Sequence, residues 1–303
     1  MPGTTPSREK TKPSNKVDAR ASSQEATIPA ENALKSSGRV IETDKLIGPQ
    51  QITGILSNRL FLRLGAKGRR FQRVDFKYSI FDACYLRDCE FDSCDFTGVR
   101  FVASNLSGST FLGCKFDYAV FERTFVNPEI LETSCPATEN LIARFARSLR
   151  INFQQIGDAQ AVNRAITVEL SATKQHLYKA WRSGESYYRK KYPGVRRVQA
   201  YFQWLRFVSE DFVWGNGESV FKLFRTIALT LILITPIDIG FDPQKSFSVL
   251  TSYSSGLLES FEIFLGVYSP TYYPKPYASI VVLLRLIVFG LMISIIVKRR
   301  NRR

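Results

Sequence analysis

The chain of 303 residues has little of the chemistry that enzymes and metal sites require. It contains a single histidine, His176, and 5 cysteines, none of which lie in a Cys-x-x-Cys pair. No nucleophile–base pair, metal-ligand cluster or glycine-rich phosphate loop can be assembled from its residues. We therefore predict that the protein is not an enzyme and uses neither a metal nor a cofactor. Because His176 lies in a polar helical stretch, we expect it on the surface.

Apolar residues are scarce at the start of the chain. Residues 1–45 are rich in Ser, Thr, Pro, Lys and Glu and contain no apolar core segment, which argues against a signal peptide. This composition is typical of a disordered tail, and we assign residues 1–45 to it. Residues 46–70 are predicted to form a lead-in or cap for the segment that follows.

An internal repeat with a period of five begins at Phe71. On a helix, side chains five apart spiral around the axis, and on a strand they alternate faces, so neither element explains this period. The backbone must turn a corner every five residues. Phenylalanine or leucine recurs at Phe71, Phe76, Phe81, Leu86, Phe91, Phe96, Phe101, Leu106, Phe111, Phe116 and Phe121.

The residue two positions before each of these is small or modest in size, as at Cys84, Cys94 and Ser104, so both sets are expected to point inward. This pattern resembles the pentapeptide repeat family. The resemblance implies a right-handed quadrilateral β-helix over residues 71–126, with four repeats per coil and residues 20 apart stacked. The phenylalanines then form three columns, and the leucines Leu86 and Leu106 share the fourth, continued by Val126.

The placement of charge separates the classes of anionic partner. The net charge is +15, but residues 71–125 carry six basic and eight acidic side chains, a net of −2. That is too weak for the DNA mimicry practised by some pentapeptide repeat proteins. The chain instead has a basic cluster, including Lys298, Arg299 and Arg300, directly after an apolar run. This placement favours a lipid bilayer over nucleic acid as partner.

Residues 137–218 are predicted to be a helical linker. Apolar spacing over residues 138–185 indicates two or three helices. The stretch from Tyr201 to Trp214 differs, because it is bulky, aromatic and flanked by arginines. Trp204 and Trp214 could anchor a helix in the lipid headgroup region. A buried core helix explains the same residues equally well.

Residues 219–303 are predicted to be a two-span membrane domain. Residues 220–241 and 277–297 are each long and apolar enough to cross a bilayer. Basic residues flank the start of the first span and the end of the second. The positive-inside rule then predicts a multi-pass plasma-membrane protein with both termini cytoplasmic. Buried helices of a soluble protein are the alternative. Arg285 lies within the second span, and Asp238, near the end of the first, is a candidate partner, as are Glu259 and Glu262.

The connection between the spans resembles that of two-span, potassium-channel-type proteins. Leu257, Leu258, Phe261, Phe264 and Leu265 share one face of a short predicted helix, followed by a glycine-containing turn. We predict a re-entrant pore-type loop over residues 249–270.

Most of the chain beyond the tail resembles pentapeptide repeat proteins fused to such a channel domain. In that family a Trp-Gly or Tyr-Gly motif precedes the first span, as Trp214-Gly215 does here. A potassium filter reads Thr-x-Gly-Tyr-Gly-Asp. This chain has Phe264-Leu-Gly-Val-Tyr-Ser-Pro instead. The candidate pore residues, from the helix and the filter-like turn, are Glu259, Glu262, Gly266, Val267, Tyr268 and Ser269.

These features predict a homo-oligomeric pore, tetrameric by family resemblance, regulated by a cytoplasmic repeat domain that binds an unidentified protein or stimulus. Arg285 would favour anions if it lined the pore, and Glu259 and Glu262 would favour cations. Two alternatives remain, a non-conducting membrane-anchored scaffold and a membrane-permeabilising defence effector.

Overall fold

The computed structural model describes residues 38–300, so most of the predicted tail lies outside the described residues. A β-solenoid comes first, and its strands alternate between two parallel sheets, ordered β1-β3-β5-β7-β9 and β2-β4-β6-β8. The strands are β1 (Val40–Thr43), β2 (Ile52–Ile55), β3 (Arg59–Leu62), β4 (Arg70–Asp75), β5 (Ile80–Asp82), β6 (Glu90–Asp92), β7 (Arg100–Val102), β8 (Thr110–Leu112) and β9 (Val120–Glu122).

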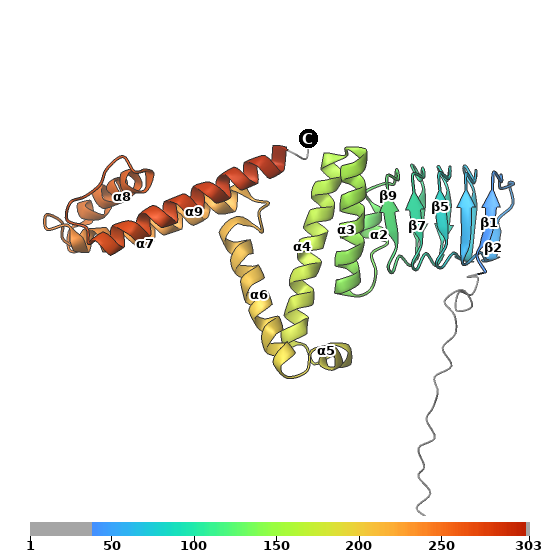
Figure 1. The fold of residues 1–303 in the computed structure, drawn as a ribbon, viewed down its shortest axis with the longest axis horizontal. Helices are drawn as coiled ribbons and strands as arrows, with labels where there is room; N and C mark the ends of the chain where they lie inside the picture. The colour runs from blue at the N-terminus through green and yellow to red at the C-terminus, as the bar shows by residue number, and fades with distance from the viewer. Residues whose placement is uncertain (1–37, 301–303) are drawn as a thin grey trace, which may run out of the picture. The chain divides into compact units, whose positions relative to one another are not determined.

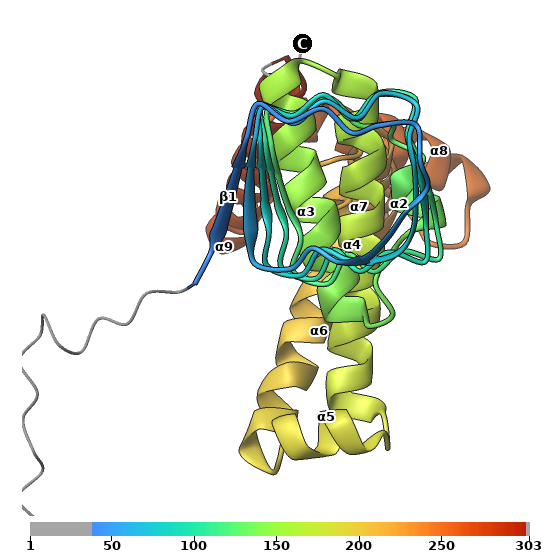
Figure 2. The ribbon, with the colours of Figure 1, turned by 90° about the vertical axis from the view of Figure 1, so that its right-hand side faces the viewer.

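The solenoid begins before the predicted repeats. Strand β1 pairs with β3, and β2 pairs with β4 with a register shift between Ile52 and Gly54. Residues 40–55 therefore belong to the solenoid rather than to a tail and lead-in. Isolated bridges, such as Asp75 to Asp95 and Tyr85 to Asn105, supply the two remaining sides. Viewed along the stack, the coils superpose as a four-sided outline (Figure 2). The five-residue pattern is interrupted before Phe71, because Ala66 and Gln51 stand where the period would place phenylalanine or leucine.

The predicted register is confirmed. Phe71 pairs with Phe91 and Phe81 with Phe101, each twenty residues apart. Their rings stack with centroids 4.8 Å and 5.1 Å apart. Stacked parallel strands place identical side chains about 4.8 Å apart, which suits offset ring stacking. All eleven predicted core residues are buried.

The smaller inward residues join neighbouring coils by hydrogen bonds. The Ser104 hydroxyl donates to the Phe81 carbonyl at 3.1 Å and accepts from the Cys84 backbone N–H at 3.0 Å. The Cys84 thiol donates in turn to the Phe61 carbonyl at 3.2 Å. These contacts satisfy buried backbone groups that the short strands leave unpaired, which explains why Ser and Cys recur here.

Helices close the C-terminal end of the solenoid. After α2 (Ile130–Thr133), helix α3 (Glu139–Ile156) lies across the last coil. The Asn152 side chain accepts from the Thr124 N–H at 2.7 Å and donates to the Thr124 carbonyl at 2.8 Å. Phe145 continues the phenylalanine stack, 5.5 Å from Phe116. The cap therefore replaces both the hydrogen bonds and the apolar contact of a further coil.

The linker is helical, as predicted. Helix α3 ends at Gly157, whose φ of 80° permits the tight turn into α4 (Ala159–Arg182). Helix α5 (Ser186–Lys191) follows, and α6 (Val195–Trp214) packs back against α4. Figure 1 shows α3 and α4 side by side between the solenoid and α6.

The C-terminal region contains three helices. Helix α7 (Val220–Phe241) and helix α9 (Lys275–Arg300) contact each other, and α8 (Leu250–Leu265) lies in their connection and contacts both. Helices α7 and α9 agree with the two predicted spans, although α9 is longer than residues 277–297. Helix α8 occupies the centre of the predicted 249–270 segment.

Candidate membrane site

Helices α7 and α9 are long and apolar enough to cross a membrane. Only 17% of the most apolar window of each is buried within the chain. Large apolar side chains on both helices are exposed, including Leu233 at 71% and Ile280 at 63%. A core helix of a soluble protein would bury such residues, so this exposure argues against that alternative.

The face of α8 that packs inward is not the predicted apolar face. Leu257, Leu258 and Phe261 are exposed, and Phe264 is the member of the predicted set that is buried. The buried face carries Ser252, Gly256 and Ser260 along with Ile263 and Phe264. A Cβ on Gly256 would lie 3.2 Å from the Thr235 methyl group, so the glycine permits close approach of α7. Small residues inside and leucines outside are typical of helix packing in lipid.

Asp238 joins the three helices. It is 3% exposed, on α7. The Ser260 hydroxyl of α8 donates to it at 2.5 Å, and the Tyr277 hydroxyl of α9 donates at 2.8 Å. Asp238, one of the candidate partners of Arg285, is therefore bonded to Ser260 and Tyr277 instead. Ser260 and Tyr277 lie 22 and 39 residues from Asp238 along the chain, so the local sequence pattern could not predict these hydrogen bonds.

Arg285 instead lies against Gly266, the residue that ends α8. Gly266 has a φ of +80°, and a Cβ there would come within 1.8 Å of the Arg285 Nη1 atom. The guanidinium thus occupies the space that a side chain would need. No ion pair or hydrogen bond of the Arg285 side chain occurs within residues 38–300. It faces the carboxyl end of α8, where the helix dipole favours positive charge.

The two candidate pore glutamates lie beside a cavity of about 530 Å³. Lys245 makes ion pairs with both Glu259 and Asp242, so the Glu259 charge is compensated within the chain. The Glu262 side chain is exposed. The cavity is lined by Asp242, Pro243, Gln244, Glu259, Glu262, Tyr268 and Tyr272.

The filter-like residues, Gly266 to Ser269, come directly after the last residue of α8. The Gly266 and Val267 N–H groups donate to the Ile263 and Glu262 carbonyls, at 3.0 Å and 2.9 Å, and so close the end of α8. Val267 is 78% exposed and Tyr268 42% exposed, and Ser269 is exposed as well. In a single chain these side chains therefore have few contacts.

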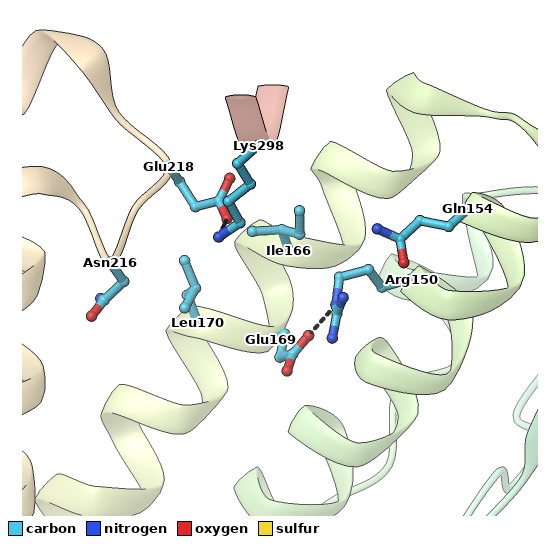
Figure 3. Close-up of a pocket in the computed structure, with 8 residues that line it drawn as sticks. All are labelled: Arg150, Gln154, Ile166, Glu169, Leu170, Asn216, Glu218 and Lys298. Carbon is cyan, nitrogen blue, oxygen red and sulfur yellow. Dashed lines mark hydrogen bonds and ion pairs between the residues drawn. The ribbon is translucent and has the colours of Figure 1, made fainter. Parts of the chain in front are cut away.

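At the opposite end of the hairpin, an ion pair and a hydrogen bond join the end of α9 to the residue Glu218 before α7. Lys298 of α9 pairs with Glu218, just before α7, and Arg299 donates to the Glu218 carbonyl at 3.3 Å. A pocket of about 350 Å³ lies here, next to the Arg150–Glu169 ion pair of α3 and α4 (Figure 3). Arg300, the third predicted anchor, is the last residue of α9.

The two predicted tryptophan anchors have different surroundings. Trp214 packs against the hairpin cluster that contains Leu223 and Ile295. Trp204 lies between α6 and α4, with its ring centroid 5.4 Å from that of Trp181. Trp204 therefore holds the two linker helices together and does not lie on the outer face of α6.

Several residues of the site were missed from the sequence. Ser260, Tyr277, Lys245 and Glu218 each bond a predicted residue across at least 14 positions. Single polar residues of this kind have no local pattern. Only the position of Tyr277 at the start of an apolar run could have drawn attention to it.

Comparison with known proteins supports the assignment of the repeats. The pentapeptide-repeat family model matches residues 70–108 and 94–126, with 8 copies, so this segment of the chain consists of pentapeptide repeats. Two solved structures of trypsin-treated variants of QnrB1, a plasmid-mediated fluoroquinolone resistance protein, are similar to part of the chain. One is 20% identical with a TM-score of 0.11, and the match covers 29% of this chain and 54% of the chain in that structure. The other is 15% identical with a TM-score of 0.15, and the match covers 28% of this chain and 62% of the chain in that structure.

The chain thus spans less than two thirds of the length of the structures it matches. No curated protein sequence matches the chain.

Proposed function

We propose that the hairpin of α7, α8 and α9 inserts into the plasma membrane and assembles with further copies into an ion-conducting pore. The pentapeptide-repeat solenoid would lie in the cytoplasm, bind a protein partner or stimulus, and bias the open state. A tetramer is proposed from the resemblance to two-span channels.

The contact between Gly266 and Arg285 carries this proposal. Arg285 is ten residues after Lys275, or about 15 Å along α9. The hydrocarbon core of a bilayer is about 30 Å thick. If α9 spans the membrane, the end of α8 lies near half depth, and the chain from Gly266 to Tyr273 must return to the surface it came from. That path is a re-entrant loop.

The exposure of this loop supports assembly. Non-helical backbone at membrane depth has to line water or be covered by protein. In one chain Val267 and Tyr268 are exposed. Further copies arranged around a central axis would cover the outer side of the loop and leave the inner side to water.

A chain of packed elements supports coupling between the solenoid and the hairpin. Helix α3 caps the solenoid, α3 packs on α4, α4 on α6, and α6 on α7. A partner that moves the solenoid would move the start of α7 through these contacts.

The test is current across a planar bilayer that contains the purified full-length protein. We expect conductance, with a reversal potential in asymmetric salt that shifts in Glu262→Gln or Arg285→Gln. Glu132→Gln, on the exposed side of α2, is the matched control and should leave the reversal potential unchanged. Absence of conductance at every voltage and pH tried would refute the pore.

A non-conducting, membrane-anchored scaffold is the second candidate. The Arg285 guanidinium placed at the end of α8 favours it, because a fixed cation beside the re-entrant loop would repel cations. A membrane-permeabilising effector is a variant of the first proposal. Dye entry and growth arrest on overexpression would identify the effector, and a scaffold would cause neither.

A further inference from the structure

Helix α6 has a second apolar face that no other part of residues 38–300 covers. Its inner face packs on α4 through Ala200, which is 2% exposed, and Trp204. The outer face carries Val195, Val198, Phe202 and Leu205, exposed at 74%, 55%, 61% and 41%. These four residues follow a spacing of i, i+3, i+7 and i+10, so they form one stripe along the helix. We call it the outer stripe.

Basic residues predominate in the sequence around the outer stripe, and one of them, Arg206, pairs with Glu210. Residues 182–206 contain seven basic residues and a single acidic one, Glu185. The basic residues are Arg182, Arg189, Lys190, Lys191, Arg196, Arg197 and Arg206. An apolar stripe within a segment rich in arginine and lysine suits the headgroup region of anionic lipid, where the stripe contacts acyl chains and the cations contact phosphate. A nucleic acid would use the charge but would leave the stripe in water.

The outer stripe belongs to a helix that is held at the start of a candidate span. Lys222 of α7 pairs with Asp211 of α6 at 2.6 Å. The Thr226 hydroxyl donates to the Val213 carbonyl at 2.8 Å. Arg225 donates to the Phe212 carbonyl and lies 4.3 Å from the centre of its ring. Figure 1 shows α4 on one side of α6 and the hairpin on the other.

We infer that the outer stripe of α6 lies in the headgroup region of the anionic leaflet at which α7 begins, with α4 on its cytoplasmic side. The bilayer, and not a second copy or a soluble partner, is the occupant that its charge and its continuity with α7 select. This inference requires insertion of the hairpin but not conduction, so it is independent of whether the pore conducts.

The experiment uses full-length protein in a Cys135→Ser background, because the other four cysteines are buried. A Phe202→Cys variant carries an environment-sensitive fluorophore. The matched control is Leu112→Cys, an apolar residue of strand β8 that is 56% exposed. Both are reconstituted in phosphatidylcholine vesicles, with and without phosphatidylglycerol, and in the same mixtures containing brominated lipid.

We expect the label at position 202 to shift its emission to the blue and to lose fluorescence to brominated lipid, more strongly with phosphatidylglycerol. The label at position 112 should show neither effect. Equal, water-like emission at both positions would overturn the inference. Protection of position 202 from an aqueous quencher without loss to brominated lipid would also overturn it, because it would assign the stripe to a protein contact.

The anionic preference has its own test. The side chains of Lys190 and Arg196 make no hydrogen bond or ion pair within the described part of the chain. The double variant Lys190→Gln, Arg196→Gln should reduce the extra quenching that phosphatidylglycerol produces and keep the quenching in phosphatidylcholine alone. If wild-type quenching does not depend on phosphatidylglycerol, recognition of anionic headgroups is refuted.

Discussion

At the scale of single residues, Gly266 and Arg285 show how a backbone conformation and a charge depend on each other. Gly266 adopts a φ of +80°, which is costly for a residue with a Cβ. The guanidinium of Arg285 fills the space beside it. The carboxyl end of α8 then offsets part of the charge of an arginine that has no acidic partner in the described residues.

Gly266→Ala should therefore destabilise the hairpin by about 1–3 kcal/mol, because it strains the backbone and displaces Arg285. The measurement is unfolding in detergent by increasing fractions of dodecyl sulfate. Gly290→Ala, on α9, is the matched control, since a Cβ there meets nothing within 4 Å. It should leave the hairpin at least as stable. Equal behaviour of the two variants would contradict the role of Gly266.

His176 is a second residue whose surroundings differ from expectation. It is half-buried rather than on the surface, with Nδ1 3.3 Å from the Tyr188 hydroxyl and Nε2 3.1 Å from the Tyr192 hydroxyl. The Tyr188 hydroxyl donates to Glu139 at 3.0 Å, so it can only accept from Nδ1–H. Burial, followed by repulsion from Lys191, lowers the pKa of His176 below 6.5.

A lowered histidine pKa means that the unfolded chain takes up the proton more readily than the folded one. The free energy of unfolding of the linker should thus fall as pH drops below about 6.5. Amide hydrogen exchange in α4 and α5, corrected for intrinsic rates, should show weaker protection at about pH 5.5 than at about pH 7.5. His176→Gln should flatten this dependence. An unchanged pH dependence in the variant would show that another group causes it.

At the scale of elements, the position of α8 depends on the hydrogen bonds that its polar face makes. Ser260 contacts Asp238 of α7, and Asp238 also accepts from Tyr277 of α9. One buried carboxylate therefore positions three helices. Leu257, Leu258 and Phe261 of α8 are left on the outside, which suits contact with lipid or with other copies of the hairpin.

Asp238→Ala should loosen α8, because it leaves the Ser260 and Tyr277 hydroxyls without their acceptor. The expected cost is about 1–3 kcal/mol for each buried group left unsatisfied. Hydrogen exchange of α8 in detergent should rise in this variant. Ser260→Ala, which removes a single donor, should have a smaller effect. If exchange in α8 is the same in wild type and Asp238→Ala, the carboxylate does not hold the helices together.

At the scale of the whole molecule, the Glu218–Lys298 ion pair places the beginning of α7 and the end of α9 together. The linker and solenoid precede α7, so both ends of the membrane hairpin and the solenoid should lie on one side of the bilayer. The loop that contains Gln244, at the other end of α7, should lie on the opposite side.

Membrane-impermeant maleimide applied to intact cells tests this topology. In the Cys135→Ser background, Gln244→Cys should react from outside, and Glu132→Cys should react only after the cells are opened. Reaction of Glu132→Cys in intact cells would place the solenoid outside and refute a cytoplasmic location.

The sequence by itself determined the features that depend on local periodicity. The five-residue period located the core phenylalanines and leucines. The resemblance to pentapeptide repeats implied four repeats per coil, and the columns and the register followed from that number. Length and hydropathy located α7 and α9 in the same way. The first coils, residues 40–55, escaped because the period is less regular there.

Only the tertiary structure decided which faces meet and which polar groups bond. The leucine face of α8 and the stripe of Val198, Phe202 and Leu205 on α6 both have helical spacing, which cannot say whether an apolar face is covered by protein or by lipid. Likewise, the partners of Asp238, and the glycine beside Arg285, lie far away along the chain. Such contacts depend on how helices pack in space, and that packing leaves no trace in the spacing of neighbouring residues.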